Sequence, residues 1–205
     1  MENGQKIKIR DYVSIIAGLL FLLIWQQAGA GSMSSREYQV KAAFLYNFLT
    51  FVDWPAEKIP ANDEPIVIGI IGDDPFGDAF DPIKDKDING RRVIVKWFKG
   101  IGELKKSDVT VINKASEAIR KCHLLFICSS EEGVVKEIVD LVKGYNVLTV
   151  GDMDKSLESS GVIIKFIPEE ERVHFEINNT VALQAKLQIR LQLLRLAKKV
   201  IGQEL

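Results

Sequence analysis

The chain lacks most of the features that mark the common functional classes. Its 205 residues include only two cysteines and two histidines, and its net charge at pH 7 is −1. Such an evenly balanced surface gives no electrostatic reason to bind nucleic acid, and the chain has no polybasic segment for an anionic membrane. The sequence contains neither Gly-x-Gly-x-x-Gly nor Gly-Lys-Ser/Thr, which excludes the common phosphate-binding loops.

The two cysteines are separated by an apolar stretch. Cys122 and Cys128 flank residues His123–Ile127, which have the composition of a buried strand. A strand of that length would hold the two α-carbons roughly 20 Å apart, whereas a disulfide requires about 7 Å or less. We therefore expect no disulfide between them, and instead two buried free thiols or an intermolecular bridge from one of them.

The N-terminal apolar run is too short for a membrane span. It covers Ile15–Trp25, fewer than the roughly 20 residues that a bilayer-spanning helix needs. Three basic residues precede it, and the small residues Ala28-Gly29-Ala30 follow it. This order is typical of a cleavable signal peptide. We therefore predict a signal peptide over residues 1–30 and, after cleavage, a periplasmic domain over residues 31–205 that does not insert into the membrane.

Hydrophobic periodicity predicts an α/β fold. Apolar residues at spacings of three and four predict a buried helix over residues 37–54. Strand and helix patterns alternate from residue 66 to residue 158, which implies crossover connections and a largely parallel sheet with flanking helices. The strands are expected at Ile66–Ile71, Arg92–Trp97, His123–Ile127 and Asn146–Val150.

Shorter patterns predict further elements between these strands. Val109–Ile112 could form a short strand, followed by a short helix at Ser116–Lys121. Ser129 and Glu132 have the spacing of a capping box, which predicts a helix that continues to about Lys143.

The C-terminal part has a different pattern. Val162–Phe166 and Arg172–Ile177 are β-rich runs joined by a short polar link, which predicts a C-terminal antiparallel β-hairpin. Leucines at helical spacing then predict a long terminal helix over Asn179–Ile201. No linker or internal repeat interrupts the sequence, so we expect a single domain.

Polar residues at strand ends are the candidates for a ligand site. Asp73, Asp152 and Asp154 follow predicted strands, and open α/β sheets bind ligands at such places. Turn formation and helix capping are the ordinary roles of these residue types. The functional hypothesis that follows is a small-ligand sensor that uses the three carboxylates.

No set of residues predicts an enzyme. Ser129 and Ser130 follow a strand, but no Gly-x-Ser-x-Gly surrounds them. His123, His174 and Glu176 could hold a metal ion only if the fold brought them together, and strands often carry such residues on a solvated face. We therefore predict no catalytic residues, no metal ion and no cofactor.

Several segments together resemble the YfiR-like family. The first is Glu37–Phe48, which continues to Phe51-Val52-Asp53-Trp54-Pro55. The others follow in order along the chain: Ile68-Gly69 with Asp74-Pro75-Phe76-Gly77, Cys122–Ile127 with Ser130-Glu131, Val147–Gly151, Val173–Asn178 and Leu193–Ala197. The matching segments extend over nearly all of the chain that follows the predicted signal peptide.

The resemblance implies a regulatory function. Relatives are periplasmic negative regulators that bind the sensor domain of an inner-membrane diguanylate cyclase and thereby lower cyclic-di-GMP synthesis. Relatives also form dimers, so a homodimer is one expected assembly. The family offers no catalytic residue that could be carried over to this sequence.

Four residues are the candidates for partner binding. Arg190 and Arg195 are expected on the exposed face of the predicted terminal helix, and Tyr46 and Trp54 belong to the aromatic stretch near the start of the domain. The other explanation for Tyr46 and Trp54 is packing in the core. A small-ligand sensor remains the alternative function.

Overall fold

The computed structural model describes residues 28–58, 64–84, 86–169 and 172–202. The chain divides into two units, Met1–Glu37 and Tyr38–Leu205, and the fold described below is that of the second unit. The basic start and the apolar run of the predicted signal peptide lie outside the described residues. Helix α2, Ala28–Phe51, includes most of the helix that the sequence predicts over residues 37–54 and ends before Pro55.

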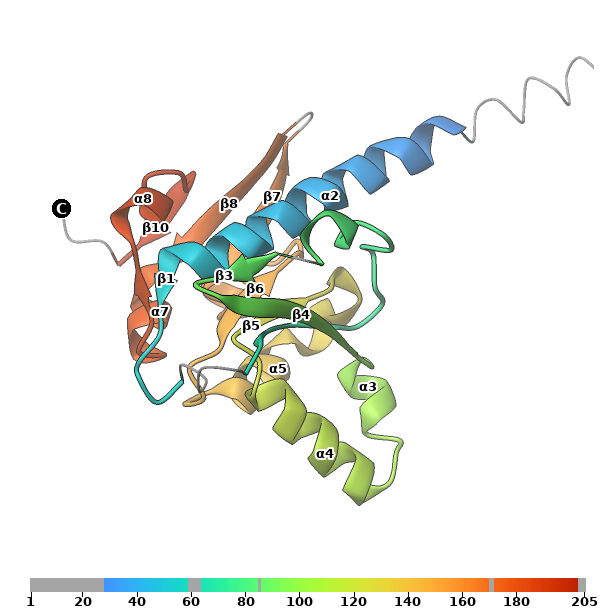
Figure 1. The fold of residues 1–205 in the computed structure, drawn as a ribbon. Coiled ribbons are helices and arrows are strands. Elements are labelled where there is room, and N and C mark those ends of the chain that lie inside the picture. Colours follow the sequence, from blue (N-terminus) through green and yellow to red (C-terminus); the bar gives the residue numbers. More distant parts are fainter. Residues whose placement is uncertain (1–27, 59–63, 85, 170–171, 203–205) are drawn as a thin grey trace, which may run out of the picture. The chain divides into compact units, whose positions relative to one another are not determined.

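A largely parallel sheet forms the centre of the fold (Figure 1). Among the described residues it has eight strands in the order β10-β8-β7-β6-β5-β2-β4-β3. Their bounds are β2 Ile66–Ile71, β3 Asp87–Ile88, β4 Arg91–Phe98, β5 Leu124–Ile127, β6 Leu148–Gly151, β7 Ile164–Glu169, β8 Arg172–Asn178 and β10 Lys199–Ile201. The pairs β3–β4 and β7–β8 are antiparallel, and the other neighbours are parallel. The predicted fold class and the predicted C-terminal hairpin are therefore confirmed.

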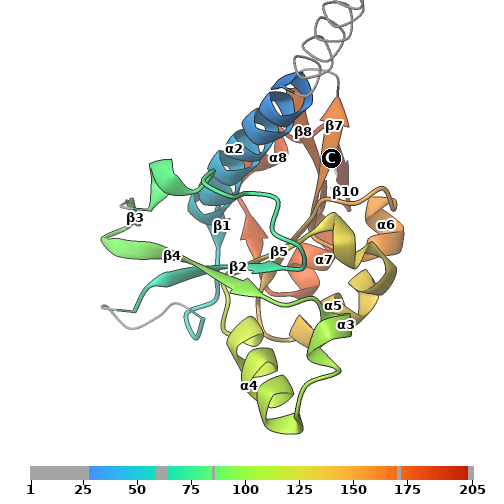
Figure 2. The same ribbon diagram turned by 90° about the vertical axis from the view of Figure 1, so that its right-hand side faces the viewer.

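The central strands are apolar because helices cover both faces of the sheet. Side chains of Leu124–Ile127 point alternately into two separate cores, as the geometry of a strand requires. The first core lies against α2, and the second lies against α4, Val109–Arg120, and α5, Val135–Val142 (Figure 2). An uninterrupted apolar run in the sequence is what a strand buried on both faces needs.

The strand predicted at Val109–Ile112 is wrong, because α4 runs without a break to Arg120. Ala115 and Ile119 pack into the second core at a spacing of four residues. Val109, in contrast, is 72% exposed. The buried stripe of one amphipathic helix therefore decides the structure here, and the β-branched residues at its start do not.

Four other described helices, all before β7, are short. They are α3 Ile101–Leu104, α6 Leu157–Ser160 and the 3₁₀ helices η1 Asp81–Ile83 and η2 Ser129–Val134. The predicted capping box does not form, because Ser129 is the first residue of η2 and the Glu132 carboxylate accepts a hydrogen bond from the Lys155 N–H at 2.8 Å. The α-helix consequently starts only at Val135.

The long terminal helix predicted over Asn179–Ile201 is wrong. The segment forms α7 Asn179–Gln184, β9 Gln188–Ile189, α8 Leu191–Leu194 and β10. Lys186 has a φ of 56°, which is incompatible with a continuing helix. Strand β9 pairs with β1, Val52–Asp53, and the buried Leu187 and Ile189 flank the exposed Gln188. Pairing between distant segments thus overrides local helix propensity.

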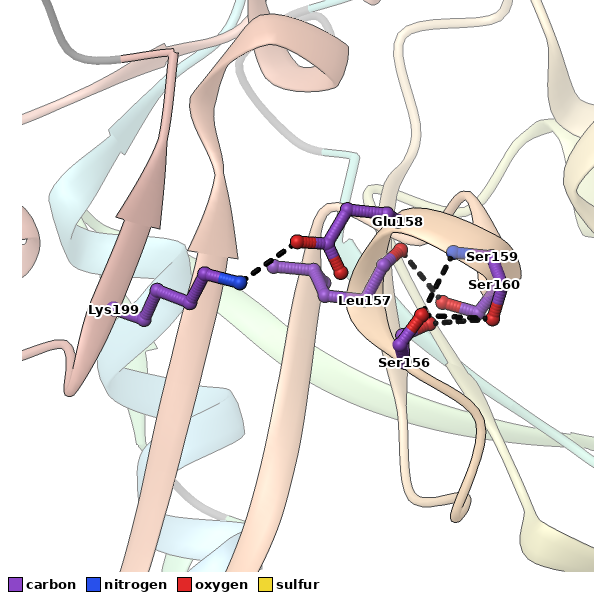
Figure 3. A network of polar contacts seen from close by, with 6 residues as sticks. All are labelled: Ser156, Leu157, Glu158, Ser159, Ser160 and Lys199. Atoms are coloured by element: carbon purple, nitrogen blue, oxygen red, sulfur yellow. Dashed lines mark hydrogen bonds and ion pairs between the residues drawn. The ribbon is translucent and has the colours of Figure 1, made fainter.

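A polar network attaches strand β10 to helix α6 (Figure 3). The Lys199 Nζ of β10 lies 2.7 Å from the Glu158 Oε1 of α6. The Ser156 Oγ accepts a hydrogen bond from the Ser159 N–H at 3.2 Å and thereby caps α6. Both members of the ion pair are about half exposed, so the pair orients the strand more than it stabilises the fold.

Candidate functional site

Asp152, one of the predicted ligand residues, is engaged by helix α2. It follows β6, and its Oδ2 accepts hydrogen bonds from the Lys41 Nζ at 2.7 Å and from the Tyr38 Oη at 2.8 Å. Lys41 is 1% exposed, and its Nζ lies 4.5 Å from the centre of the Tyr38 ring and 5.8 Å from that of Phe166. A buried ammonium requires such a carboxylate and such aromatic faces. The Asp152 carboxylate therefore connects α2 to the carboxyl end of the sheet.

The other two predicted ligand residues have exposed side chains. The Asp73 N–H donates a hydrogen bond to the Ser130 Oγ at 3.0 Å, in the turn after β2. The Asp154 carbonyl accepts a hydrogen bond from the Lys165 Nζ at 3.4 Å. Both contacts are those of ordinary turn residues. The ligand role of Asp73, Asp152 and Asp154 stays a prediction.

Negative charge gathers around Cys128, where β5 ends. Burial raises the pKa of the Cys128 thiol to about 12, and the charges of Asp74, Asp152, Glu131 and Asp73 contribute to the same shift. Asp73 and Asp152, two of the three predicted ligand residues, therefore both act on the Cys128 thiol at the carboxyl end of the sheet. This acidic surrounding disfavours an anionic ligand at this edge.

Cys122 occupies the opposite end of the same strand. Burial raises the pKa of its thiol to about 11, and the positive charges of Lys58 and Lys96 act in the opposite direction. Both Cys122 and Cys128 are buried and free. Since the thiolate is the reactive form, both groups are poor nucleophiles at neutral pH.

The residues weighed as metal ligands do not converge. His123 precedes β5, whereas His174 and Glu176 lie on β8, and strands β6 and β7 separate β5 from β8 in the sheet. Across the described ranges, no group of three or more His, Cys, Asp or Glu side chains is placed to hold a metal ion. The metal hypothesis for this set is therefore wrong.

His123 is a buried base that packs beside Trp54. Its Nδ1 accepts a hydrogen bond from the Val67 N–H at 3.1 Å, and its Nε2 has no hydrogen-bond partner within the described part of the chain. Burial, and next the positive charge of Lys58, lower the pKa of His123 to about 4. The Trp54 ring lies edge-to-face with the His123 ring, with 6.2 Å between the ring centres. The Trp54 Nε1 donates a hydrogen bond to the Asn146 carbonyl at 3.1 Å. These contacts favour core packing for Trp54, and its partner role stays a prediction.

A hollow of about 610 Å³ opens beside His123 at the amino ends of β2 and β5. Half of the residues that line it are charged: Glu57, Lys58, Glu64, Lys96, Arg120 and Lys121. Several are already engaged, because the Lys58 Nζ donates to the Arg120 carbonyl at 2.9 Å and Lys121 pairs with Glu117 at 2.6 Å. The mixed signs and internal pairs do not define a particular ligand.

Arg190 and Arg195 do not share a long helix. Arg190 is the N-cap of α8, and its guanidinium binds Asp53 of β1 through Nη2 at 2.6 Å and Nε at 3.1 Å. The hydrogen bond from Arg190 lowers the pKa of Asp53. Arg190 is therefore occupied within the chain, whereas Arg195 follows α8 with an exposed side chain.

Three residues around α8 form a small exposed surface, the C-terminal patch, which consists of Leu191, Arg195 and Leu196. Leu191 is 49% exposed and Leu196 is 65% exposed. The Arg195 N–H donates to the Leu191 carbonyl at 3.0 Å, so these residues lie one turn apart. Exposed apolar side chains beside an arginine are typical of protein interfaces.

Tyr46 has a structural contact of its own. Its Oη donates to the Asp87 carbonyl at 2.8 Å, and the Lys86 Nζ lies 5.6 Å from the centre of its ring. Tyr46 thus connects α2 to strand β3. Its role in partner binding stays a prediction.

Sequence reasoning missed the role of the buried Glu131. Its side chain is 8% exposed, and its Oε2 accepts a hydrogen bond from the Ile101 N–H at 2.9 Å, at the start of α3. A β-carbon at Gly100 would collide with this carboxylate. Gly100 is a sequence signal that another group approaches the backbone closely here. The approaching residue, Glu131, lies 30 residues after Ile101, beyond the range of local sequence patterns.

Comparisons with known proteins give a family and a similar fold. A solved structure of a conserved domain protein from Vibrio cholerae O1 biovar El Tor matches with a TM-score of 0.50 at 11% sequence identity. The match covers 80% of this chain, which spans 60% of the length of that one. No curated protein matches the sequence.

The described helices are all too short or too polar to cross a membrane. The profile of the YfiR/HmsC-like family matches residues 38–198, which contain the whole sheet except for the last strand, β10. Since the match extends over most of the sequence, the chain belongs to the YfiR/HmsC-like family.

Proposed function

We propose that this protein is a periplasmic negative regulator that binds the sensor domain of an inner-membrane diguanylate cyclase and lowers cyclic-di-GMP synthesis. The observation that carries the proposal is the family match over residues 38–198. The leader pattern over residues 1–30 supports export, because a basic start, a short apolar run and small residues are what a signal peptidase substrate contains.

The internal contacts of the polar side chains support a binding function over an enzymatic one. Asp152 is held by two donors from α2, and His123 is buried with a pKa of about 4. A general base acts best with a pKa near the working pH and within reach of a substrate. His123 does not meet the first condition, because its pKa lies about three units below neutral pH.

The C-terminal patch is the surface that we assign to the partner. Its two leucines are exposed, and Arg195 supplies a cation that an acidic sensor domain would complement. Arg190 contributes by fixing the position of α8 through Asp53. Direct contact of Tyr46 and Trp54 with the partner stays a prediction.

The test is a measurement of cyclic-di-GMP in the host. Deletion of the gene should raise the nucleotide level, and the wild-type gene should restore it. A variant with Leu191→Asp and Leu196→Asp should fail to restore it. Val109→Asp, which changes an exposed apolar residue on α4, is the control and should restore it. Unchanged cyclic-di-GMP after deletion, with the cyclase present, would contradict the proposal.

The alternative function is a periplasmic sensor of a small ligand at Asp73, Asp152 and Asp154. It has less support, because the Asp152 carboxylate already accepts two hydrogen bonds within the chain. A thermal-shift screen of the purified protein against amino acids and nucleotides separates the two functions. A ligand that raises the melting temperature, and loses that effect in Asp73→Asn, would favour the sensor.

A further inference from the structure

One side of strand β4 is open. β4 pairs with β2 from Val93 to Phe98. On the other side, β3 pairs only with Arg91 and Arg92, and no other strand of the described ranges continues this pairing. The second half of β4 is therefore an edge of the sheet.

The hydrogen-bond pattern shows which backbone groups face outward. In a parallel ladder, both backbone groups of one residue bond to the same neighbouring strand, and those of the next residue point to the other side. The Phe98 carbonyl accepts from the Gly72 N–H at 3.2 Å on the β2 side. The Val93 N–H donates to the Lys86 carbonyl at 3.3 Å on the outer side. Odd-numbered residues of β4 therefore face outward, and even-numbered residues face β2.

Val95 and Trp97 consequently direct both their N–H and their C=O groups away from the sheet. Trp97 is 51% exposed, so this part of the edge borders solvent. Outward backbone groups of an edge strand are a template for pairing with another extended segment. We call residues 95–98 the β4 edge.

Side chains around the β4 edge determine which segment fits. Arg92 and Lys96 lie on one face of the strand, are exposed, and form no ion pair with a described residue. Val95 and Trp97 lie on the other face, where Val95 packs against the first core. A second copy of this edge would bring like charges together, which destabilises strand pairing. An acidic segment would instead neutralise the two cations.

We propose that the β4 edge binds, by strand addition, an extended segment of a partner protein in which acidic and apolar residues alternate. The acidic side chains contact Arg92 and Lys96, the apolar ones contact Val95 and Trp97, and the segment's backbone pairs with the outward N–H and C=O groups. In the order of the sheet this edge lies at the opposite end from β10. The proposal is thus separate from the C-terminal patch and does not depend on the cyclase.

Amide hydrogen exchange tests the geometry of the edge in the purified protein. The amides of Val95 and Trp97 should exchange at least about tenfold faster than those of Ile94 and Lys96, which are bonded to β2. Equal and slow exchange of all four amides would overturn the proposal, because the edge would then be covered already.

Peptide titration tests the chemistry of the partner. A seven-residue peptide that alternates glutamate with valine should bind saturably and slow exchange at Val95 and Trp97 by about tenfold or more. A peptide that alternates lysine with valine should not bind. Absence of saturable binding of the glutamate peptide would overturn the proposal, as would a dimer in sedimentation experiments that dissociates in the Val95→Pro variant.

Three variants make the test specific. Arg92→Glu with Lys96→Glu should weaken binding of the glutamate peptide by about tenfold or more and create binding of the lysine peptide. Val95→Pro removes an outward N–H and leaves the bonds to β2 in place, so it should weaken binding in a folded protein. Lys136→Glu with Lys143→Glu, two exposed changes at α5, is the control for net charge and should have no effect. Equal effects of the two double variants would contradict strand addition at this site.

Discussion

Lys41 and Asp152 form a 2.7 Å ion pair between α2 and the end of β6, although 111 residues separate them in the sequence. The Lys41 side chain is 2% exposed and the Asp152 side chain is 12% exposed. Asp152→Asn keeps the size of the side chain and removes its charge, so it should lower the free energy of unfolding by about 2–4 kcal/mol. Urea denaturation measures the change.

The control for this prediction is Glu137→Gln. It removes an ion pair with Lys105 whose members are 46% and 58% exposed. Because exposed pairs contribute little, its effect should stay below about 1 kcal/mol. Equal losses in the Asp152 and Glu137 variants would mean that the buried pair has no special role.

His123 should make the protein less stable in mild acid. Its pKa is about 4 in the folded protein and 6.5 in the absence of the fold, so the unfolded chain binds a proton that the folded protein does not. The free energy of unfolding should therefore fall by roughly 3 kcal/mol between pH 7 and pH 4, with the loss beginning near pH 6.5.

His123→Asn tests the origin of this pH dependence. The asparagine carbonyl can accept the Val67 N–H and does not titrate, so the decline between pH 6.5 and pH 4 should become shallower. His174→Asn is the matched removal of an imidazole elsewhere, on β8. An unchanged pH profile in the His123 variant would assign the acid sensitivity to other groups.

The two thiols should be unreactive in the native protein. With pKa values of about 11 and 12, about one Cys122 in a thousand and fewer Cys128 are ionised at pH 8. Ellman's reagent should therefore modify both cysteines in seconds only after denaturant is added. Rapid modification of either thiol in the native protein would show that its end of β5 opens readily.

Two glycines near α3 should respond to alanine in opposite directions. Gly100→Ala places a β-carbon against the buried Glu131 carboxylate and should lower stability by about 1–3 kcal/mol. Gly102→Ala has open space around the new β-carbon and lies within α3, so it should raise stability by up to about 1 kcal/mol. Thermal unfolding of the two variants measures the difference, and a shared sign would refute this account of Glu131.

Elements whose pattern is local and whose burial is two-sided could be predicted from the sequence. Ile66–Ile71 is an unbroken apolar run, and the structure places it as a strand between β5 and β4 with both faces covered. The hairpin around residues 164–178 followed from two β-rich runs joined by a polar link. In both cases the burial pattern alone specifies the strand.

Elements that depend on distant partners could not be predicted. The segment from Asn179 has leucines at helical spacing, yet the buried-exposed-buried order of Leu187, Gln188 and Ile189 follows the period of a strand. This short pattern forms a strand because Ile189 pairs with Val52, a residue far earlier in the chain. For the same reason, the sequence suggested Asp152 as a ligand residue, since its partner Lys41 belongs to a distant helix.

The pairing of Val52 with Ile189, next to the bond between Asp53 and Arg190, closes a loop of 137 residues with a ladder of two residues. Ordering so long a chain costs entropy that a short ladder recovers only after the intervening sheet has formed. We therefore expect the β1–β9 pairing to be the last contact to form during folding and the first to break in denaturant. A folding intermediate would then keep its central strands while its last twenty or so residues remain accessible to proteases.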